Sequence, residues 1–329
     1  MRNGDNNLFN AEFNSIEKEK DSPHIRNTVY KIFTIYSLLT LFCFLLLLRG
    51  DMNWFEALCH SLSTISTGGF SVSNGNIGSY SIYSQYVIIL FMFLSGISYF
   101  LFIFAFKGKW KRLFKDEQLK FYVFLIFFFT FFIFFFELFF KNYDFFSAIR
   151  ISLFYVVSIV SSTGFDLQVN SLGMLPTIIF IFLMFVGGCS ASSSTGLKIV
   201  RALVLIRYIP VSLKRIFHPR AIIPVRYNGK ALRDESVRLI FGFFFLFLLI
   251  FLAGAFSFSV MGNGFIVSLS LSAASISNMG PIMGSIAEGF SYGDLNIVSK
   301  YILMVLMLIG RLEIYAFFAL FSKSVWGRS

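Results

Sequence analysis

The sequence predicts an all-α, polytopic membrane protein made of three helix–pore-loop–helix repeats. Of its 329 residues, 57% are apolar and 14% are charged, and the mean hydropathy is +0.75, which is unlike a soluble domain. Three Gly-centred loops also recur, each after a short apolar segment and between two long apolar runs. Because glycine lets the backbone turn its carbonyls toward an ion, this recurrence is typical of an ion pore.

The long runs approach the 20 residues that a helix needs to cross about 30 Å of hydrocarbon. They lie at about 30–48, 82–106, 119–140, 172–206, 237–261 and 298–322. Three shorter runs, at about 54–66, 145–161 and 264–277, cannot span and suit re-entrant pore helices. The expected architecture is therefore about six spanning helices with three pore helices.

The three loops are spaced almost evenly along the chain. Gly68 and Gly164 are 96 residues apart, and Gly164 and Gly280 are 116 apart, which indicates internal repetition. A polar insert after Arg207 lengthens the second interval. We therefore expect pore repeats over residues 28–106, 119–206 and 237–329, separated by linkers 107–118 and 207–236.

Basic residues gather in these two linkers, which predicts that both are cytoplasmic. The net charge of +11 then reflects membrane orientation and contact with membrane lipid, anionic lipid included. No nucleic-acid partner is expected, because the sequence predicts no soluble basic domain to bind one.

Four segments carry a family resemblance: Asn53–Phe70, Val157–Phe165, Gly310–Tyr315 and the linker stretch His218–Lys230. Together they resemble the Trk/Ktr/HKT superfamily of potassium transporters, most of all the bacterial Trk-type translocating subunit. The resemblance covers nearly the whole chain. It implies a potassium uptake subunit in the bacterial cytoplasmic (inner) membrane, while the choice between potassium alone and potassium with sodium stays open.

The resemblance places the ion filter in the three loops. The implied filter residues are Thr67, Gly68, Gly69, Thr163, Gly164, Phe165, Asn278, Met279 and Gly280, with the backbone carbonyls of Gly68, Gly164 and Gly280 binding potassium. Hydroxyl and amide oxygens beside glycine carbonyls suit one dehydrated monovalent ion, and the loops carry no carboxylate ring for a divalent one. Close packing of small residues between helices is the alternative.

A second stretch interrupts the run at 172–206 at membrane depth. Its small and polar residues are Gly187, Gly188, Ser190, Ser192, Ser193, Ser194, Thr195 and Gly196. Non-helical backbone is tolerated there only if protein buries it or it lines water, so we place this stretch beneath the filter loop at 161–165. The resemblance implies that it is the gate, and ordinary close packing is the alternative.

Charged residues near this stretch have competing interpretations. Arg311 is placed near the gate by the resemblance, where it forms a positive barrier or holds the serine-rich loop closed, or else joins a structural ion pair. Lys198 and Arg201 are expected to extend to the cytoplasmic surface. His60 and Arg150 are expected to anchor the pore helices at the outer interface.

The family is expected to carry four repeats, and this chain supplies three. Residues 1–27 resemble the cytoplasmic linker after the first repeat, so we expect the first repeat to be missing and Met1 to be an internal start. Either a separate polypeptide supplies that repeat, or the gene has been truncated, or the chain is a degenerate remnant. One alternative function is a truncated, non-conducting structural or regulatory membrane protein. Another is a sodium-coupled solute carrier, since broken helices also build substrate sites.

An enzyme is not expected, because His60 is the one histidine near the membrane and no catalytic set accompanies it. The resemblance implies a homodimer and a cytoplasmic nucleotide-binding regulatory subunit of the RCK/KTN type, docked on the basic face. It implies no bound cofactor, and potassium enters as the transported ion.

Overall fold

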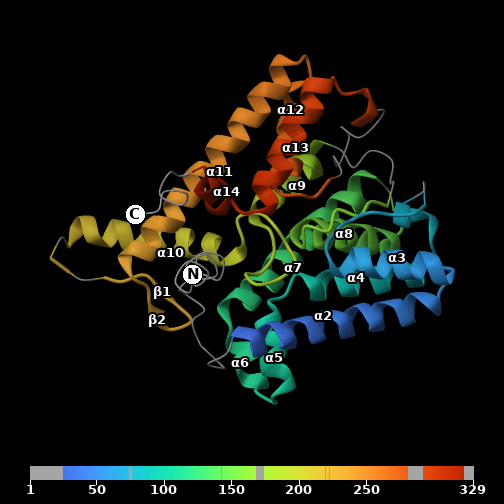
Figure 1. Ribbon diagram of the computed structural model, residues 1–329, viewed down its shortest axis with the longest axis horizontal. Helices are drawn as coiled ribbons and strands as arrows, with labels where there is room; N and C mark the ends of the chain where they lie inside the picture. The colour runs from blue at the N-terminus through green and yellow to red at the C-terminus, as the bar shows by residue number, and fades with distance from the viewer. Residues whose placement is uncertain are drawn as a thin grey trace.

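The structure is a computed structural model, and it describes residues 25–73, 76–141, 143–167, 174–218, 220–221, 223–280 and 292–321. Residues 1–24, most of the predicted N-terminal linker, lie outside this set. Within it, the strands are two antiparallel pieces of two residues each, β1 (Arg226–Tyr227) and β2 (Lys230–Ala231). Everything else that is regular is helical, which confirms the all-α class (Figure 1).

The helices coincide with the predicted apolar runs. The first group is α2 (Ile25–Leu48), α3 (Trp54–Ile65), α4 (Ile82–Ser95) and α5 (Tyr99–Phe106). The second is α7 (Glu117–Phe140), α8 (Phe145–Val160), α9 (Met174–Val186) and α10 (Ile199–Phe217). The third is α11 (Asp234–Val260), α12 (Phe265–Ile276), α13 (Ile297–Arg311) and α14 (Ile314–Leu320). Short pieces α6 (Trp110–Lys115), η1 (Asn76–Ser79) and η2 (Tyr292–Asp294) connect them.

Polar side chains set the ends of the helices in the first group. At the start of α3, the Glu56 amide donates to Asn53 Oδ1 at 2.9 Å and the Asn53 amide donates to Glu56 Oε2 at 3.0 Å, a capping box. The carboxylate of Asp51 accepts bonds from the Ser81 amide at 2.6 Å and from the hydroxyls of Ser81 at 2.7 Å and Ser84 at 2.6 Å. The turn after α2 is thereby tied to the start of α4.

The long helices expose apolar side chains that water would not tolerate. Helices α2, α7 and α11 are long and apolar enough to cross a membrane, and 17%, 22% and 33% of their most apolar stretches are buried. On α7 the exposed faces carry Phe127, Phe131 and Phe139. Surface of this extent is stable in lipid, so the chain is a multi-pass membrane protein.

Three of the six predicted spanning runs are broken rather than continuous. The break at 187–196 is predicted, but α4 and α5 also meet at 93°, and α13 and α14 meet at 107°. At the first bend, a Cβ on Gly96 would lie 2.3 Å from Tyr122 Oη, which donates to the Phe93 carbonyl at 3.0 Å. The side chain of Tyr122 on α7 therefore fills the space beside the bend. A side chain inserted in this way is a known cause of a helix kink.

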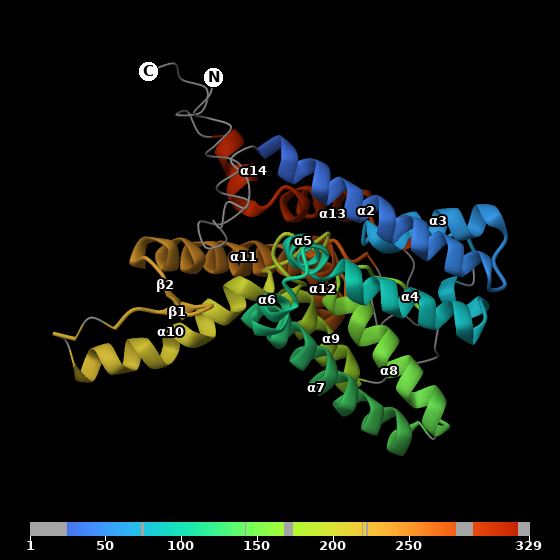
Figure 2. The ribbon, with the colours of Figure 1, turned by 90° about the horizontal axis from the view of Figure 1, so that it is seen from below.

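The second group of helices lies between the other two (Figure 1). Helix α4 packs on α8, and α9 packs on α12, while each pore helix packs against the long helices of its own group. The second half of α10 projects from the body, with the β1–β2 hairpin beside it (Figure 2). The limits of the three repeats as residues 28–106, 119–206 and 237–329 remain a prediction.

Candidate functional site

The three Gly-centred loops share one backbone conformation. Each pore helix ends in a serine cap, followed by a residue with positive φ: Thr67 (54°), Ser162 (59°) and Asn278 (52°). The next amide then donates back to the helix, from Gly68 to Ser63 O, from Thr163 to Ser158 O and from Met279 to Ala274 O, at 2.7, 2.9 and 2.9 Å. This is the Schellman helix end, repeated three times.

That equivalence shows which glycines occupy the same place in the three loops, while the carbonyls that bind potassium remain a prediction. Two residues after each left-handed residue stands a glycine that is itself left-handed: Gly69 (φ 69°), Gly164 (78°) and Gly280 (85°). Gly68 corresponds instead to Thr163 and Met279. The predicted set of Gly68, Gly164 and Gly280 therefore combines residues from two different positions of the loop. The sequence permitted this choice because the first loop has two successive glycines, Gly68 and Gly69.

The first two filter loops are in direct contact. A Cβ on Gly69 would lie 2.0 Å from the Thr163 carbonyl oxygen, so this approach requires glycine. Serine side chains of the pore helices stabilise the residues at which the chain leaves each of these two loops. Ser63 Oγ accepts from the Phe70 amide at 2.8 Å, and Ser158 Oγ donates to the Phe165 carbonyl at 2.8 Å. Thr163 and Met279 are buried beneath the loops.

His60, buried in α3, packs against residues that follow the first and second loops. Its Nδ1 donates to the Glu56 carbonyl at 2.8 Å, and its Nε2 lies 3.0 Å from Ser71 Oγ. Its ring centroid is 5.1 Å from that of Tyr80 and 6.2 Å from that of Phe165. His60 therefore contacts the segments that follow the first and second loops, and its expected role as an anchor at the outer interface remains a prediction.

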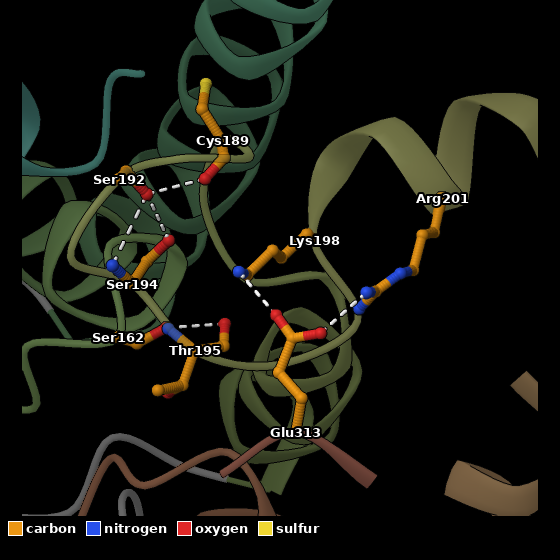
Figure 3. Close-up of polar contacts among 8 residues, drawn as sticks. All are labelled: Ser162, Cys189, Ser192, Ser194, Thr195, Lys198, Arg201 and Glu313. Carbon is orange, nitrogen blue, oxygen red and sulfur yellow. Dashed lines mark hydrogen bonds and ion pairs between the residues drawn. The ribbon is translucent and has the colours of Figure 1, made fainter. Parts of the chain in front are cut away.

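The predicted gate residues other than Arg311 form a compact loop between α9 and α10, residues 187–198, which we call the intramembrane loop. The amide of Leu197 donates to Phe185 O at 3.1 Å and that of Ile199 to Gly188 O at 3.0 Å, which closes the loop at its base. Inside it, Ser192 Oγ donates to Cys189 O at 2.6 Å and lies 2.6 Å from Ser194 Oγ (Figure 3).

Close backbone approaches fix the glycines of this loop. A Cβ on Gly187, where φ is 66°, would lie 2.2 Å from the Thr195 carbonyl oxygen, and one on Gly188 would lie 2.5 Å from Ser194 Oγ. Gly196 is left-handed as well, at φ 95°. Ser190, Ser194 and Thr195 are buried, so protein encloses this non-helical backbone at membrane depth as expected.

The intramembrane loop is hydrogen-bonded to all three filter loops. Thr67 Oγ1 donates to the Ser193 carbonyl at 3.0 Å. Ser162 Oγ donates to the Thr195 carbonyl at 3.1 Å and accepts from the Thr195 amide at 3.3 Å. Thr195 Oγ1 in turn donates to the Ser277 carbonyl. The loop therefore contacts the end of every pore helix, through Thr67, Ser162 and Ser277, and not one of them alone.

A sequence profile described as "Cation transport protein" (TrkH) matches residues 3–327. The chain belongs to this TrkH family. It is 30% identical to a Trk system potassium uptake protein TrkH of Halomonas elongata, over 94% of this chain and 65% of the relative, and 31% identical to TrkG of Escherichia coli, over 97% and 66%. The crystal structure of the potassium transporter TrkH from Vibrio parahaemolyticus superposes with a TM-score of 0.87 at 29% identity, over 95% of this chain and 68% of that one.

These comparisons confirm the predicted family and the helical membrane fold. The relatives are named as transport proteins and not as enzymes. This TrkH-family chain spans about two thirds of the length of the curated relatives that it matches.

The bend of the first helix group also holds the intramembrane loop of the TrkH-family chain. The amide of Cys189 donates to the Gly96 carbonyl and that of Tyr99 donates to the Ala191 carbonyl, both at 2.9 Å. The hydroxyl of Tyr99 lies 2.6 Å from Ser193 Oγ. The break at Gly96 frees these backbone groups from helical bonding, so the bend itself creates the contact.

Glu313, at the bend between α13 and α14, is the acidic partner of the loop. Its carboxylate accepts from Lys198 Nζ at 2.7 Å and from Arg201 Nη2 at 2.8 Å (Figure 3). The guanidinium of Arg201 also lies 3.9 Å over the Phe243 ring, and the residue is buried. The expectation that Lys198 and Arg201 reach the cytoplasmic surface is therefore wrong, because both side chains pair with the carboxylate of Glu313, whose side chain is 18% exposed.

Arg311 is exposed at the end of α13 and makes no ion pair or hydrogen bond with the residues that the structure describes. Asn278 Nδ2 instead donates to the Met307 carbonyl on the same helix at 3.1 Å, and Tyr292 donates to the Gly280 carbonyl. Tyr99, Ser162 and Ser277 were not predicted from the sequence as contacts of the intramembrane loop. One signal was present: Ser66, Ser161 and Ser277 each stand three residues before the left-handed glycine.

Proposed function

We propose that this chain forms most of a potassium pore, with sodium as a second permeant ion, in a bacterial cytoplasmic membrane. The filter would be the carbonyls of Gly69, Gly164 and Gly280, assisted by the oxygens of their neighbours. The observation that supports it is the bonding of one intramembrane loop to all three filter loops. An obstruction directly below the filter is what a gate requires.

The chemistry of the loops fits a monovalent cation. Left-handed glycines turn successive carbonyls to different sides, and rings of such carbonyls replace the water that a cation sheds. Among the residues that the structure describes, no three His, Cys, Asp or Glu side chains gather to hold a divalent metal. Potassium here is the transported substrate, and the chain itself needs no cofactor for this function.

The gate would open when the intramembrane loop leaves its hydrogen bonds. Each neutral bond contributes about 0.5–1.5 kcal/mol net, so the few bonds to the filter loops and to Tyr99 are weak enough to break together in a μs–ms transition. Arg311, exposed near the filter, would add a positive barrier to cations below it.

We also propose that the basic linkers are cytoplasmic and that the second one, residues 207–236, docks a nucleotide-binding regulatory subunit of the RCK/KTN type. The second linker is tied to the helix that leads to the gate: Glu117 Oε2 accepts from Arg207 Nη1 at 2.6 Å and from the Asn228 amide at 2.7 Å. Since Arg207 lies on α10, which follows the intramembrane loop, a partner on this linker would act on the loop through α10. A homodimer is proposed on the family resemblance.

A fourth helix–pore helix–helix unit would complete the ring. Beside the first filter loop an open groove of about 440 Å³ is lined by Tyr36, Leu62, Ser66, Gly68 and Phe70. Phe70 is 79% exposed and Leu62 is 47% exposed. We propose that such a unit, in the same or a separate polypeptide, covers this groove.

Growth of a potassium-uptake-deficient bacterium on low potassium tests the function. We expect the chain, expressed with a fourth repeat, to restore growth. Gly164→Ser should abolish growth, because a side chain strains the left-handed glycine. Gly264→Ser is the matched control, since Gly264 is exposed with φ −57° at the N-cap of α12, where serine is favoured.

Two results would contradict the proposal. One is protein that reaches the membrane in every combination without restoring growth. The other is growth that Gly164→Ser leaves unchanged. The first favours a structural or regulatory role for the chain, and the second removes the filter from the loop at 161–165.

A further inference from the structure

Helix α6 and the residues before it form an exposed surface of alternating aromatic and basic side chains. We call this the α6 surface, and its members are Phe106, Lys109, Trp110, Lys111, Phe114 and Lys115. The three rings are 72%, 57% and 69% exposed. All three lysines are exposed, and none of their ammonium groups makes a hydrogen bond or ion pair within the part of the chain that the structure describes.

The helix divides these side chains into two adjacent edges. Trp110 and Phe114 are four residues apart and share one edge, while Lys111 and Lys115 share the next. Helix α6 packs on both α5 and α7, so these edges have a fixed position (Figure 1). Arg112 is not among the free cations, because its guanidinium lies 5.2 Å over the Phe104 ring of α5.

The position of α6 is at a membrane surface. It joins the end of α5 to the start of α7, and α7 is long and apolar enough to cross the bilayer. Exposed tryptophan and phenylalanine rings are favoured at the level of the lipid headgroups. Free lysines beside them are attracted to the negative surface of a leaflet that contains anionic lipid.

We propose that the α6 surface binds an anionic phospholipid, with Trp110 and Phe114 between headgroup and acyl chains and the lysines on the lipid phosphate. Charge complementarity favours this occupant, because three exposed ammonium groups lie beside aromatic rings that are favoured at the level of the lipid headgroups. Zwitterionic lipid would satisfy the rings but leave the lysines without a net negative partner.

The site is connected to the intramembrane loop through α5. The first residue of α5 is Tyr99, whose amide and hydroxyl contact Ala191 and Ser193, and α6 begins four residues after α5 ends. Lipid bound at α6 would therefore restrain the helix that holds the loop. Binding itself can be measured without conduction, so its test is independent of the proposed function.

Fluorescence of Trp110 tests the site directly. In the Trp54→Phe, Trp326→Phe variant, Trp110 is the one remaining tryptophan. The protein is reconstituted in phosphatidylcholine vesicles that contain the same fraction of either brominated phosphatidylglycerol or brominated phosphatidylcholine. We expect the anionic quencher to be enriched at Trp110 by about fivefold for each engaged lysine.

Charge removal at the site is then compared with charge removal elsewhere. The variant Lys109→Gln, Lys111→Gln, Lys115→Gln should make the two quenchers equal. Its matched control, Lys214→Gln, Arg220→Gln, Arg233→Gln, removes the same charge from exposed positions of the other linker and should keep the difference.

Three results overturn the proposal. Equal quenching in the parent protein would mean that no anionic lipid is selected. Quenching by neither lipid would mean that the ring does not lie in the bilayer. Equal loss in both triple variants would mean that net charge, and not the α6 surface, attracts the lipid.

Discussion

The hydroxyl of Tyr99 lies 2.6 Å from Ser193 Oγ, which joins the bend of the first helix group to the intramembrane loop of the second. The Tyr99 amide reinforces this contact by donating to Ala191 O at 2.9 Å. Because one contact is made by the side chain and the other by the backbone, a substitution can remove the first and keep the second.

Tyr99→Phe should favour the open gate. Loss of one neutral hydrogen bond removes about 1 kcal/mol from the closed state, so the open fraction of a mostly closed pore rises about fivefold. Potassium flux into proteoliposomes measures this. Tyr86→Phe, on the exposed face of α4, is the control and should leave flux unchanged. A lower flux in Tyr99→Phe with normal thermal stability would contradict the role of this hydroxyl.

Substitutions at the doubled glycine distinguish the two filter registers. Gly69→Ala should abolish flux and destabilise the loop, since φ is 69° and the new Cβ would lie 2.0 Å from the Thr163 carbonyl oxygen. Gly68→Ala should be milder, because φ there is not positive and the nearest atom, Ser66 Oγ, would be 3.2 Å away. Flux and melting temperature are measured for both. A larger loss of flux and stability in Gly68→Ala than in Gly69→Ala would mean that Gly68, and not Gly69, is equivalent to Gly164 and Gly280 in the filter.

Hydropathy was sufficient to locate the long apolar runs, because bilayer thickness sets the length of a spanning helix, and the three pore helices were predicted from the shorter apolar runs. Helix α6 and the part of α10 beyond residue 206 lie in the predicted linkers and were not predicted. Two bends escaped prediction because tertiary contacts create them: Tyr122 packs where Gly96 leaves space, and Glu313 meets Lys198 and Arg201 from more than 100 residues away. Local sequence does not encode such partners. The filter register, in contrast, was present in the repeated Ser-x-x-Gly spacing and was obscured by Gly68.

Glu313→Gln should destabilise the protein more than Arg311→Gln. Arg201 is buried, and removal of its carboxylate partner leaves a charge inside the protein, a loss of about 3–5 kcal/mol when a buried pair is broken. Arg311 is exposed and has no ion pair among the described residues, so its neutralisation should lower the melting temperature little. Thermal unfolding in detergent compares the two. Equal shifts would show that the cluster around Glu313 does not stabilise the loop.

Asp51 should make the stability of the junction between α2 and α4 depend on pH. Partial burial acts to raise the pKa of its carboxyl, but hydrogen bonds from Ser84 and Ser81 outweigh it and hold the pKa below its ordinary value. A carboxyl whose pKa is lower in the folded state stabilises that state fully above its unfolded pKa of about 3.9. The contribution is lost as pH falls through the folded pKa.

Asp51→Asn should therefore lower the melting temperature at neutral pH, by the equivalent of about 1 kcal/mol given the exposure of the site. The difference from the parent protein should shrink as pH falls below about 4, since protonation then removes the same charge from the parent. Asp144→Asn is the control, because Asp144 makes no side-chain cap bond to α8. A difference that stays constant down to acidic pH would mean that the shape of the side chain at position 51, and not its charge, fastens α2 to α4.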